Sequence, residues 1–351
     1  MRIKERQRKV SKKMRIGVVN WDCSLPPETY FGYYQTRTLS PVKYRNVTPY
    51  YADILGENKI TYHKRGQAEY DRELAYAIKA GIDYFAYVFY PEEGSKNHIS
   101  LQYTDCSHRV YELNYARRMH ESSRLRQKIG MAAIVAKHPF THTDVKELVA
   151  LLAQPYYEQI DGRPLVYLFK EIKESLLADI RGECRARGIA EPYFAVMFDR
   201  NIPDDVNYQA VDAISAYGCV KSGIHTYEEL CEELRRNNEE RLSKKQAIIP
   251  LFTTGWDPSP RVDIPSPWVT YSNLSYAKAA TAEELVRGAQ QLAQWIKATA
   301  ADAFVGHIMT FAWNEFEEGG WICPTYRGDG SINDERIAAF AKIVELWKDL
   351  L

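Results

Sequence analysis

The sequence predicts an α/β fold, a single (β/α)8 TIM barrel with a long loop after strand one. Short apolar runs alternate with stretches of helical periodicity, eight such runs can be counted, and 351 residues suit eight βα units with insertions. A doubly wound open sheet is the alternative, and such a sheet usually carries a glycine-rich loop after its first strand. Here that place holds Asn20-Trp-Asp-Cys23, which contains no glycine.

The first predicted strand is Arg15–Trp21, a run rich in β-branched residues. A basic tail, residues 1–14, precedes it, and residues 15–351 are expected to form one catalytic domain. A connection over residues 22–66 follows, rich in Pro, Tyr and Thr, and is predicted to be a loop. Because so long a connection is usually functional in a compact domain, it is expected to wall a cleft or to serve as a lid.

The remaining elements alternate in the order that parallel strand pairing requires. The other predicted strands are Ile82–Tyr90, Ile129–Ala136, Leu165–Phe169, Tyr193–Phe198, Ala213–Tyr217, Ala247–Thr253 and Ile308–Trp313. The predicted helices are Gln67–Gly81, Ser107–Ser123, Thr143–Leu152, Ile172–Arg187, Tyr227–Leu242, Ala282–Thr299 and Ile332–Leu351. No internal repeat beyond this unit and no linker interrupts the chain.

Composition excludes several classes of function. Lys+Arg and Asp+Glu both number 46, so no basic surplus points to nucleic acid. No apolar run approaches the roughly 20 residues that span a bilayer, so membrane insertion is not expected. The six cysteines are scattered and read as reduced thiols, and the basic N-terminus lacks the apolar segment of a secretory signal. We therefore expect a cytoplasmic location, or a secreted or periplasmic one if a signal segment has been removed.

The last predicted strand ends in a cluster of acidic residues. Ile308–Trp313 is apolar except for Thr310, and Glu315, Glu317 and Glu318 follow it, before Gly319-Gly320. In a barrel the catalytic residues lie at the C-terminal ends of strands, and glycosidases use a pair of carboxyl groups. The cluster therefore indicates a sugar-cleaving site, although a solvated acidic turn is an equally common reason for such a pattern.

Other strand ends offer acidic, aromatic or basic side chains that could hold a sugar. Aromatic faces stack on sugar rings and carboxylates accept hydrogen bonds from hydroxyl groups. Each candidate could instead be a surface ion pair or a turn residue. The candidate substrate-binding residues are Trp21, Asp22, Tyr90, Glu92, Asp199, Trp256, Asp257, Arg261, Trp313, Asn314 and Trp321.

Other mechanisms lack their signatures. The chain contains no GxSxG elbow, no P-loop and no HExxH motif. His138 and His142 have helical ligand spacing, but Pro139 between them argues against a shared helix face. We therefore expect no metal and no organic cofactor.

Three ordered segments resemble the WbsX-like proteins, relatives of the endo-α-mannosidases of glycoside hydrolase family 99. The segments are Trp313-Asn-Glu-Phe-Glu-Glu-Gly319, Gly255-Trp-Asp-Pro-Ser-Pro-Arg261 and Tyr156-Tyr-Glu-Gln-Ile-Asp-Gly-Arg-Pro-Leu-Val-Tyr167. The resemblance runs from the first strand to the last helix and implies a (β/α)8 barrel that handles glycans. The chain departs from the mannosidase pattern at Glu317, where a histidine is usual, and at Cys323, where the broader family often has Glu.

The resemblance also implies roles for two glutamates. Glu315 would help the 2-hydroxyl of the sugar to attack the anomeric carbon, and Glu318 would protonate the leaving oxygen. Residues three apart on a regular strand point to opposite faces, so the chain is predicted to leave strand geometry at Phe316-Glu317. Glu317 is then expected to point away, toward a salt bridge or solvent.

The sequence therefore predicts a retaining glycoside hydrolase that uses Glu315 and Glu318 on a glycan. Two alternatives stay open. The chain could be a glycosyl-transferring enzyme of polysaccharide biosynthesis, although no nucleotide-sugar motif supports this, or it could be a non-catalytic glycan-binding barrel.

Overall fold

The computed structural model describes residues 13–94, 112–136, 138–198, 202–204, 206–245, 247–269, 271 and 275–350. Eight parallel strands form its central sheet, in the spatial order β11-β13-β1-β4-β5-β7-β8-β9. These strands are β1 (Arg15–Asn20), β4 (Tyr84–Phe89), β5 (Gly130–Val135), β7 (Arg163–Phe169), β8 (Tyr193–Met197), β9 (Ala213–Ser215), β11 (Leu251–Thr253) and β13 (His307–Phe311).

The two ends of this order meet just before β11. Ile248 forms a parallel bridge with Ile214 of β9, and the amide of Ile249 donates a 2.9 Å hydrogen bond to the Ile214 carbonyl. The sheet is therefore a nearly closed barrel, which confirms the predicted fold class and excludes the open doubly wound sheet.

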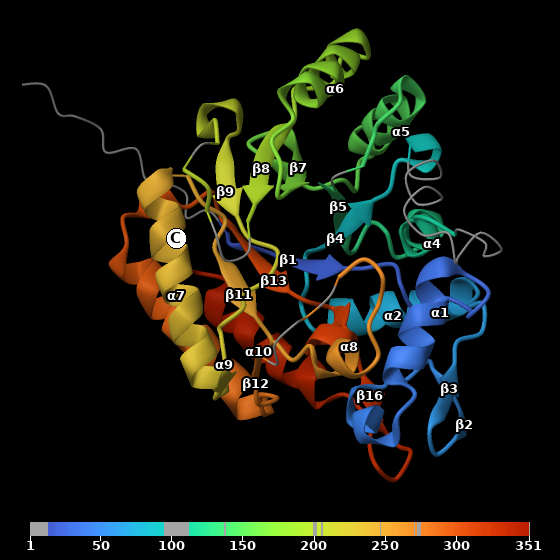
Figure 1. Cartoon of the computed structure of the whole chain (residues 1–351). Helices are drawn as coiled ribbons and strands as arrows, with labels where there is room; N and C mark the ends of the chain where they lie inside the picture. The colour runs from blue at the N-terminus through green and yellow to red at the C-terminus, as the bar shows by residue number, and fades with distance from the viewer. Residues whose placement is uncertain are drawn as a thin grey trace, which may run out of the picture.

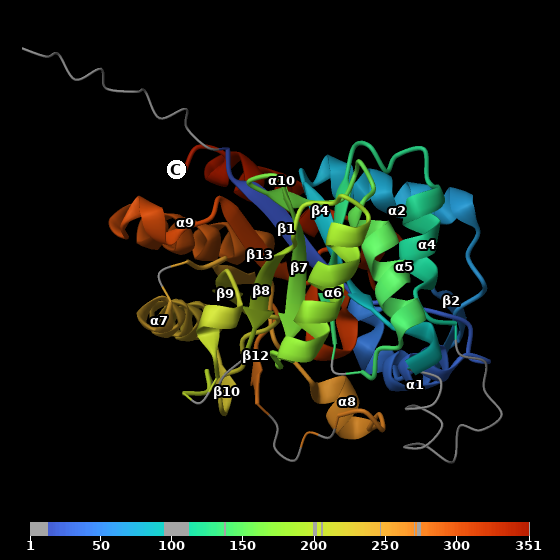
Figure 2. The same ribbon diagram turned by 90° about the horizontal axis from the view of Figure 1, so that it is seen from above.

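Helices surround the strands (Figures 1 and 2). Neighbouring helices of this ring pack on one another, for example α9 on α10 and α5 on α6. None of the helices in the described ranges combines the length and the apolar character that crossing a bilayer requires. The outer helices are α2 (Gln67–Lys79), α4 (Tyr115–Ser122), α5 (His142–Leu152), α6 (Glu174–Ala186), α7 (Tyr227–Lys244), α9 (Ala282–Ala298) and α10 (Glu335–Trp347).

The connection after β1 is not the loop that the sequence predicted. It contains α1 (Tyr30–Leu39), the 3-10 helix η1 (Val42–Val47) and a hairpin of β2 (Asp53–Gly56) and β3 (Lys59–Thr61). The Thr29 hydroxyl caps α1 by accepting a 3.1 Å hydrogen bond from the amide of Gly32. The sequence did not predict this helix, because the segment is rich in Pro and Tyr. Most buried residues of the helix are aromatic or polar rather than aliphatic.

Other differences concern shorter elements. The short helix α8 (Ser259–Asp263) was not predicted, and it packs beside α1 at the end of the barrel where β1 and β11 finish (Figures 1 and 2). The last predicted helix begins at Glu335, because Ile332–Asn333 forms the short strand β17. The first part of the predicted helix Ser107–Ser123 lies outside the described residues.

The barrel interior is filled by side chains in layers. Tyr84 of β4 and Tyr167 of β7 are separated by β5, and their hydroxyl groups lie 2.7 Å apart across the interior. Because side chains alternate along a strand, residues two or four positions further along β4 and β7 also face inward. The layer nearest the C-terminal strand ends is the one that can bound a ligand cavity.

Candidate active site

The chain leaves strand geometry between Glu315 and Glu318, as predicted. Asn314–Glu315 (β14) pairs antiparallel with Gly320–Trp321 (β15), and Phe316–Glu318 forms the 3-10 turn η5 between them. Gly319 closes the turn at a φ of 73°. A Cβ at this glycine would lie 2.4 Å from the amide nitrogen of Asp257, so only glycine fits here. The turn brings Glu315 and Glu318 to the same end of the barrel.

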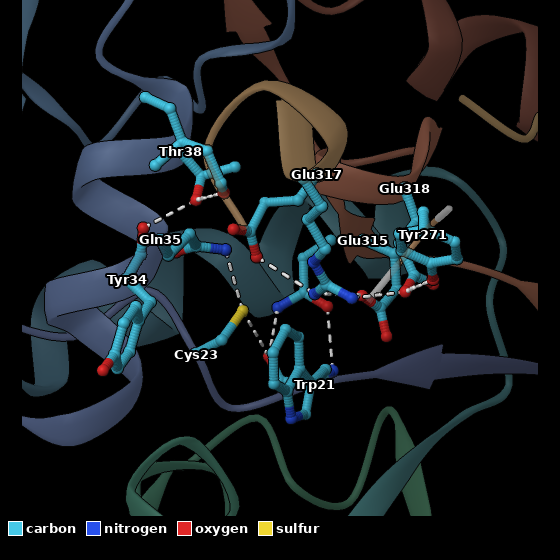
Figure 3. A network of polar contacts seen from close by, with 12 residues as sticks. Trp21, Cys23, Tyr34, Gln35, Thr38, Tyr271, Glu315, Glu317 and Glu318 are labelled. Carbon is cyan, nitrogen blue, oxygen red and sulfur yellow. Dashed lines mark hydrogen bonds and ion pairs between the residues drawn. The ribbon is translucent and has the colours of Figure 1, made fainter. Parts of the chain in front are cut away.

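Arg261, from α8, lies among three carboxylates. Its guanidinium donates hydrogen bonds to Glu318 and, at 3.1 Å, to Glu317 Oε2, and its Nη2 atom lies 3.9 Å from Glu315 Oε2. Arg261 is only 3% exposed. Figure 3 shows Glu315, Glu317 and Glu318 gathered in one place, with Glu317 turned toward Thr38 of α1 and Glu318 toward Tyr271. Glu317 therefore points away from the pair into a buried salt bridge, one of the two surroundings predicted for it.

Two phenols complete the polar partners of the pair. The hydroxyl of Tyr217 donates a hydrogen bond to Glu315, and the hydroxyl of Tyr271 donates a 2.6 Å hydrogen bond to Glu318 Oε1. Neither tyrosine was predicted as a site residue. Tyr217 ends a predicted strand, so its position at a strand end was the signal that could have identified it.

The charges in this cluster do not balance if every carboxyl is ionised. Three carboxylates face one guanidinium, and burial, followed by repulsion from Glu318, raises the pKa of Glu315 to about 8. Burial also raises the pKa of Glu317, against the attraction of Arg261. Burial around a single guanidinium therefore favours a cluster that retains a proton near neutral pH. A carboxyl that keeps its proton at neutral pH is what general acid catalysis requires.

The pair faces a cavity of about 340 Å³ at the C-terminal end of the barrel. Six predicted site residues line it: Trp21, Tyr90, Trp256, Arg261, Glu315 and Glu318. The Trp21 indole donates a 2.7 Å hydrogen bond to the Tyr90 hydroxyl, so the two aromatic side chains hold each other in place. The cavity is also lined by residues that were not predicted: Tyr30, Phe31, Val88, Ile134, Ala136, His138, Phe169, Lys170, Tyr217, Gly218, Val220, Trp268, Val269 and Tyr271.

Three of the predicted acidic residues do not line the cavity. Asp22 is buried and accepts a 2.7 Å hydrogen bond from the amide of Ala116, near the start of α4. Glu92 forms an ion pair with Arg118. Asp257 accepts a 3.0 Å hydrogen bond from the amide of Ser259, an Asx turn that starts α8. Each carboxylate stabilises local backbone or a surface pair instead of facing the cavity.

Three predicted residues around the acidic turn also lie outside the cavity lining. Trp313 is fully buried behind the turn. The Asn314 amide binds the end of β1 by accepting a 2.8 Å hydrogen bond from the Trp21 amide and donating one of 2.6 Å to the Trp21 carbonyl. Trp321 stacks on the guanidinium of Arg336, with 3.7 Å between the guanidinium carbon and the ring centre. These residues lie near strand ends, as predicted, but their side chains do not face the cavity.

Asp199, the last predicted substrate-binding residue, lies outside the described residues. Within the described ranges, no group of three or more His, Cys, Asp or Glu side chains is arranged to hold a metal ion.

Comparison with known proteins supports the fold. No protein-family model and no curated protein matches this chain. Solved structures, by contrast, do match this chain. The endo-α-mannosidase of glycoside hydrolase family 99 from Bacteroides thetaiotaomicron is similar with a TM-score of 0.56 at 13% identity, covering 96% of this chain and 98% of that chain. The same enzyme in complex with bis-tris-propane gives 0.54 at 14% identity, covering 94% and 96%. The chain therefore has a fold like that of a family 99 enzyme, as its sequence motifs implied.

Proposed function

We propose that this protein is a retaining glycoside hydrolase that cleaves a glycan with Glu315 and Glu318. The observation that carries the proposal is the arrangement of these two carboxyl groups. Both line one cavity at the C-terminal end of a parallel barrel, and both lie beside the guanidinium of Arg261. The likeness in fold to an endo-α-mannosidase that spans nearly the whole of both chains supports the same conclusion.

The chemistry needs one carboxyl group that accepts a proton and one that donates it. In the order implied by the sequence resemblance, Glu315 takes the proton of the sugar 2-hydroxyl, whose oxygen then bonds to the anomeric carbon. The bond from that carbon to the leaving oxygen breaks, and Glu318 protonates this oxygen. Water then opens the new bond by the reverse proton transfers, so the configuration is retained.

The proposed order requires the proton on Glu318 rather than on Glu315. Burial raises the pKa of Glu315, while Arg261 and Tyr271 both donate hydrogen bonds to Glu318. A sugar whose 2-hydroxyl donates to Glu315 and whose leaving oxygen accepts from Glu318 favours transfer of the proton to Glu318. The hydrogen bond from Arg261 also fixes the position of the Glu318 carboxyl group in the cavity.

Substrates with good leaving groups distinguish the two roles. An acidic phenol can leave from an aryl glycoside without being protonated. Loss of the general acid therefore has little effect on cleavage of that glycosidic bond. We expect Glu318→Gln to lose turnover on an unactivated glycan but to keep most of the rate of phenol release in the first turnover of such an aryl glycoside, whereas Glu315→Gln loses both. The reverse pattern would assign the acid role to Glu315 and leave the pair intact.

The activity itself is tested by incubating the protein with a panel of polysaccharides and following the release of reducing ends. Proton NMR of the first product formed then reports the anomeric configuration. We expect new reducing ends with the configuration of the substrate. Binding of a glycan without any release of reducing ends, under conditions where the protein is folded, would show that the barrel only binds and would overturn the proposal.

A further inference from the structure

The cavity has two unlike sides. One side carries the groups already described, Glu315, Glu318, Arg261 and the phenols of Tyr217 and Tyr271. The other side is built from the ends of β4, β5 and β7. Since the hydroxyl groups of the tyrosines in β4 and β7 meet inside the barrel, the alternation of side chains places the last inward-facing residues of these strands at the cavity floor.

These inward positions hold apolar side chains. Val88 of β4 pairs in register with Ile134 of β5, and Phe169 ends β7. Ala136, just after β5, follows Ile134 on the same face of that strand, and Val220, after β9, also lines the cavity. We call Val88, Ala136, Phe169 and Val220 the apolar wall; each is partly exposed, whereas Ile134, which also lines the cavity, is fully buried.

The polar side chains that border the wall are His138 and Lys170, which come after the strand ends, and Tyr217, whose ring centre lies 4.9 Å from that of Phe169. A sugar hydroxyl that faces Val88 or Ala136 therefore loses its bonds to water and finds no side-chain partner in the wall. Burying an unpaired hydroxyl is unfavourable, whereas burying a methyl group on the same surface is favourable. The wall thus selects against a fully hydroxylated sugar edge.

We propose that the sugar bound in this cavity carries a methyl group where common hexoses carry a hydroxyl, and that this methyl group packs on the apolar wall. A 6-deoxyhexose supplies it through its terminal methyl, and it keeps the 2-hydroxyl that the proposed reaction uses. The proposal deepens the proposed function and rests on it for the position of the ring beside the glutamate pair.

Binding of matched sugar pairs to the full-length protein tests the inference without any need for turnover. The pairs are hexoses and their 6-deoxy forms of the same configuration, titrated by NMR. A hydrophobic pocket discriminates a single methyl or hydroxyl by roughly tenfold to a hundredfold, so we expect at least one methyl-bearing member to bind about tenfold more tightly. Equal or weaker binding by the methyl-bearing member of every pair, including no binding by any sugar, overturns the inference.

Val88→Thr tests the wall directly, because threonine keeps the shape of valine but has a hydroxyl in place of one methyl group. We expect it to reduce the binding preference for the methyl-bearing sugar by about threefold or more, since it gives a facing hydroxyl a partner. Val286→Thr is the matched control: this valine is also partly buried but lies on α9, outside the cavity lining. An unchanged preference in folded Val88→Thr protein contradicts the role of the wall, and Val220→Thr repeats the test at a second wall position.

The two proposals fail in different ways. A strong preference for methyl-bearing sugars, with no release of reducing ends from any glycan that contains them, would keep the apolar wall and overturn the hydrolase. Turnover of glycans made only of fully hydroxylated sugars, with no gain for the methyl-bearing aryl glycosides, would keep the hydrolase and overturn the wall.

Discussion

The indole N–H of Trp313 donates a 2.7 Å hydrogen bond to the carboxylate of Glu73. Glu73 lies on α2, and Trp313 immediately precedes β14, the first strand of the hairpin that carries the glutamate pair. Glu73 also forms a buried ion pair with Arg65, whose guanidinium lies over the ring of Tyr51. This network fixes the base of the acidic turn from the side away from the cavity.

The first prediction is that Glu73→Ala destabilises the protein by about 3–5 kcal/mol, because it leaves Arg65 as an uncompensated buried charge. Chemical denaturation at neutral pH measures this free energy of unfolding. Asp334→Ala is the control, since Asp334 pairs with Lys79 at a largely exposed position and should cost about 1 kcal/mol or less. A Glu73→Ala variant as stable as the control would show that the network carries no such role.

The second prediction concerns pH. Burial raises the pKa of Glu315 from 4.5 to about 8 and the pKa of Asp22 from 3.8 to about 7. Both groups bind more protons in the folded than in the unfolded protein across this window, so their stabilising effect is complete near pH 4 and is lost as the pH rises to about 8. We expect the free energy of unfolding to fall between about pH 5 and pH 8.

The groups that face Glu315 are Glu317, Glu318, Arg261 and Tyr217, so the fall belongs to the cluster rather than to one residue. Glu315→Gln cannot titrate at this position and should make the dependence shallower, leaving the part that Asp22 contributes. Denaturation of both proteins at several pH values decides the matter. A variant whose stability falls with pH as steeply as that of the natural protein would rule out Glu315 as the source.

The third prediction is that Tyr217→Phe raises the pKa of Glu315 further, by roughly one unit, because the lost hydrogen bond stabilised the ionised carboxylate. Titration of the glutamate carboxyl carbons by ¹³C NMR reports this directly, independently of any substrate. Tyr326 lies outside the cavity lining, and its hydroxyl donates a hydrogen bond to the Ala52 carbonyl. Tyr326→Phe should therefore leave the titration unchanged. A lower pKa in Tyr217→Phe would contradict the assigned hydrogen bond.

Strand identity could be predicted from sequence, because each buried strand is a short apolar run and the acidic turn follows the last one. The direction of individual side chains could not. Trp313 and Trp256 both follow strands, yet Trp256 lines the cavity and Trp313 packs behind it. The difference depends on where each chain leaves the strand, and strand ends are uncertain by two or more residues in sequence.

Contacts between residues far apart in the sequence could not be predicted either. Nothing in the local sequence of Tyr271 or Trp268 links them to residues near 318, yet the Tyr271 hydroxyl binds Glu318 and Trp268 packs edge-on against Trp21. The helix α1, which brings Tyr30 and Phe31 to the same cavity, was hidden in a segment whose Pro and Tyr content indicated a loop. By contrast, the glycines after Glu318 correctly indicated the turn.

The central claim is that Glu315 and Glu318 together cleave a glycosidic bond, and turnover of an unactivated glycan by Glu318→Gln tests it most directly. We expect turnover to fall by roughly two orders of magnitude or more with glycan binding retained, and Glu315→Gln to behave alike. Glu92→Gln is the control, because Glu92 pairs with Arg118 outside the cavity lining and its loss should leave turnover nearly unchanged. Full turnover by the folded Glu318→Gln variant would contradict the account.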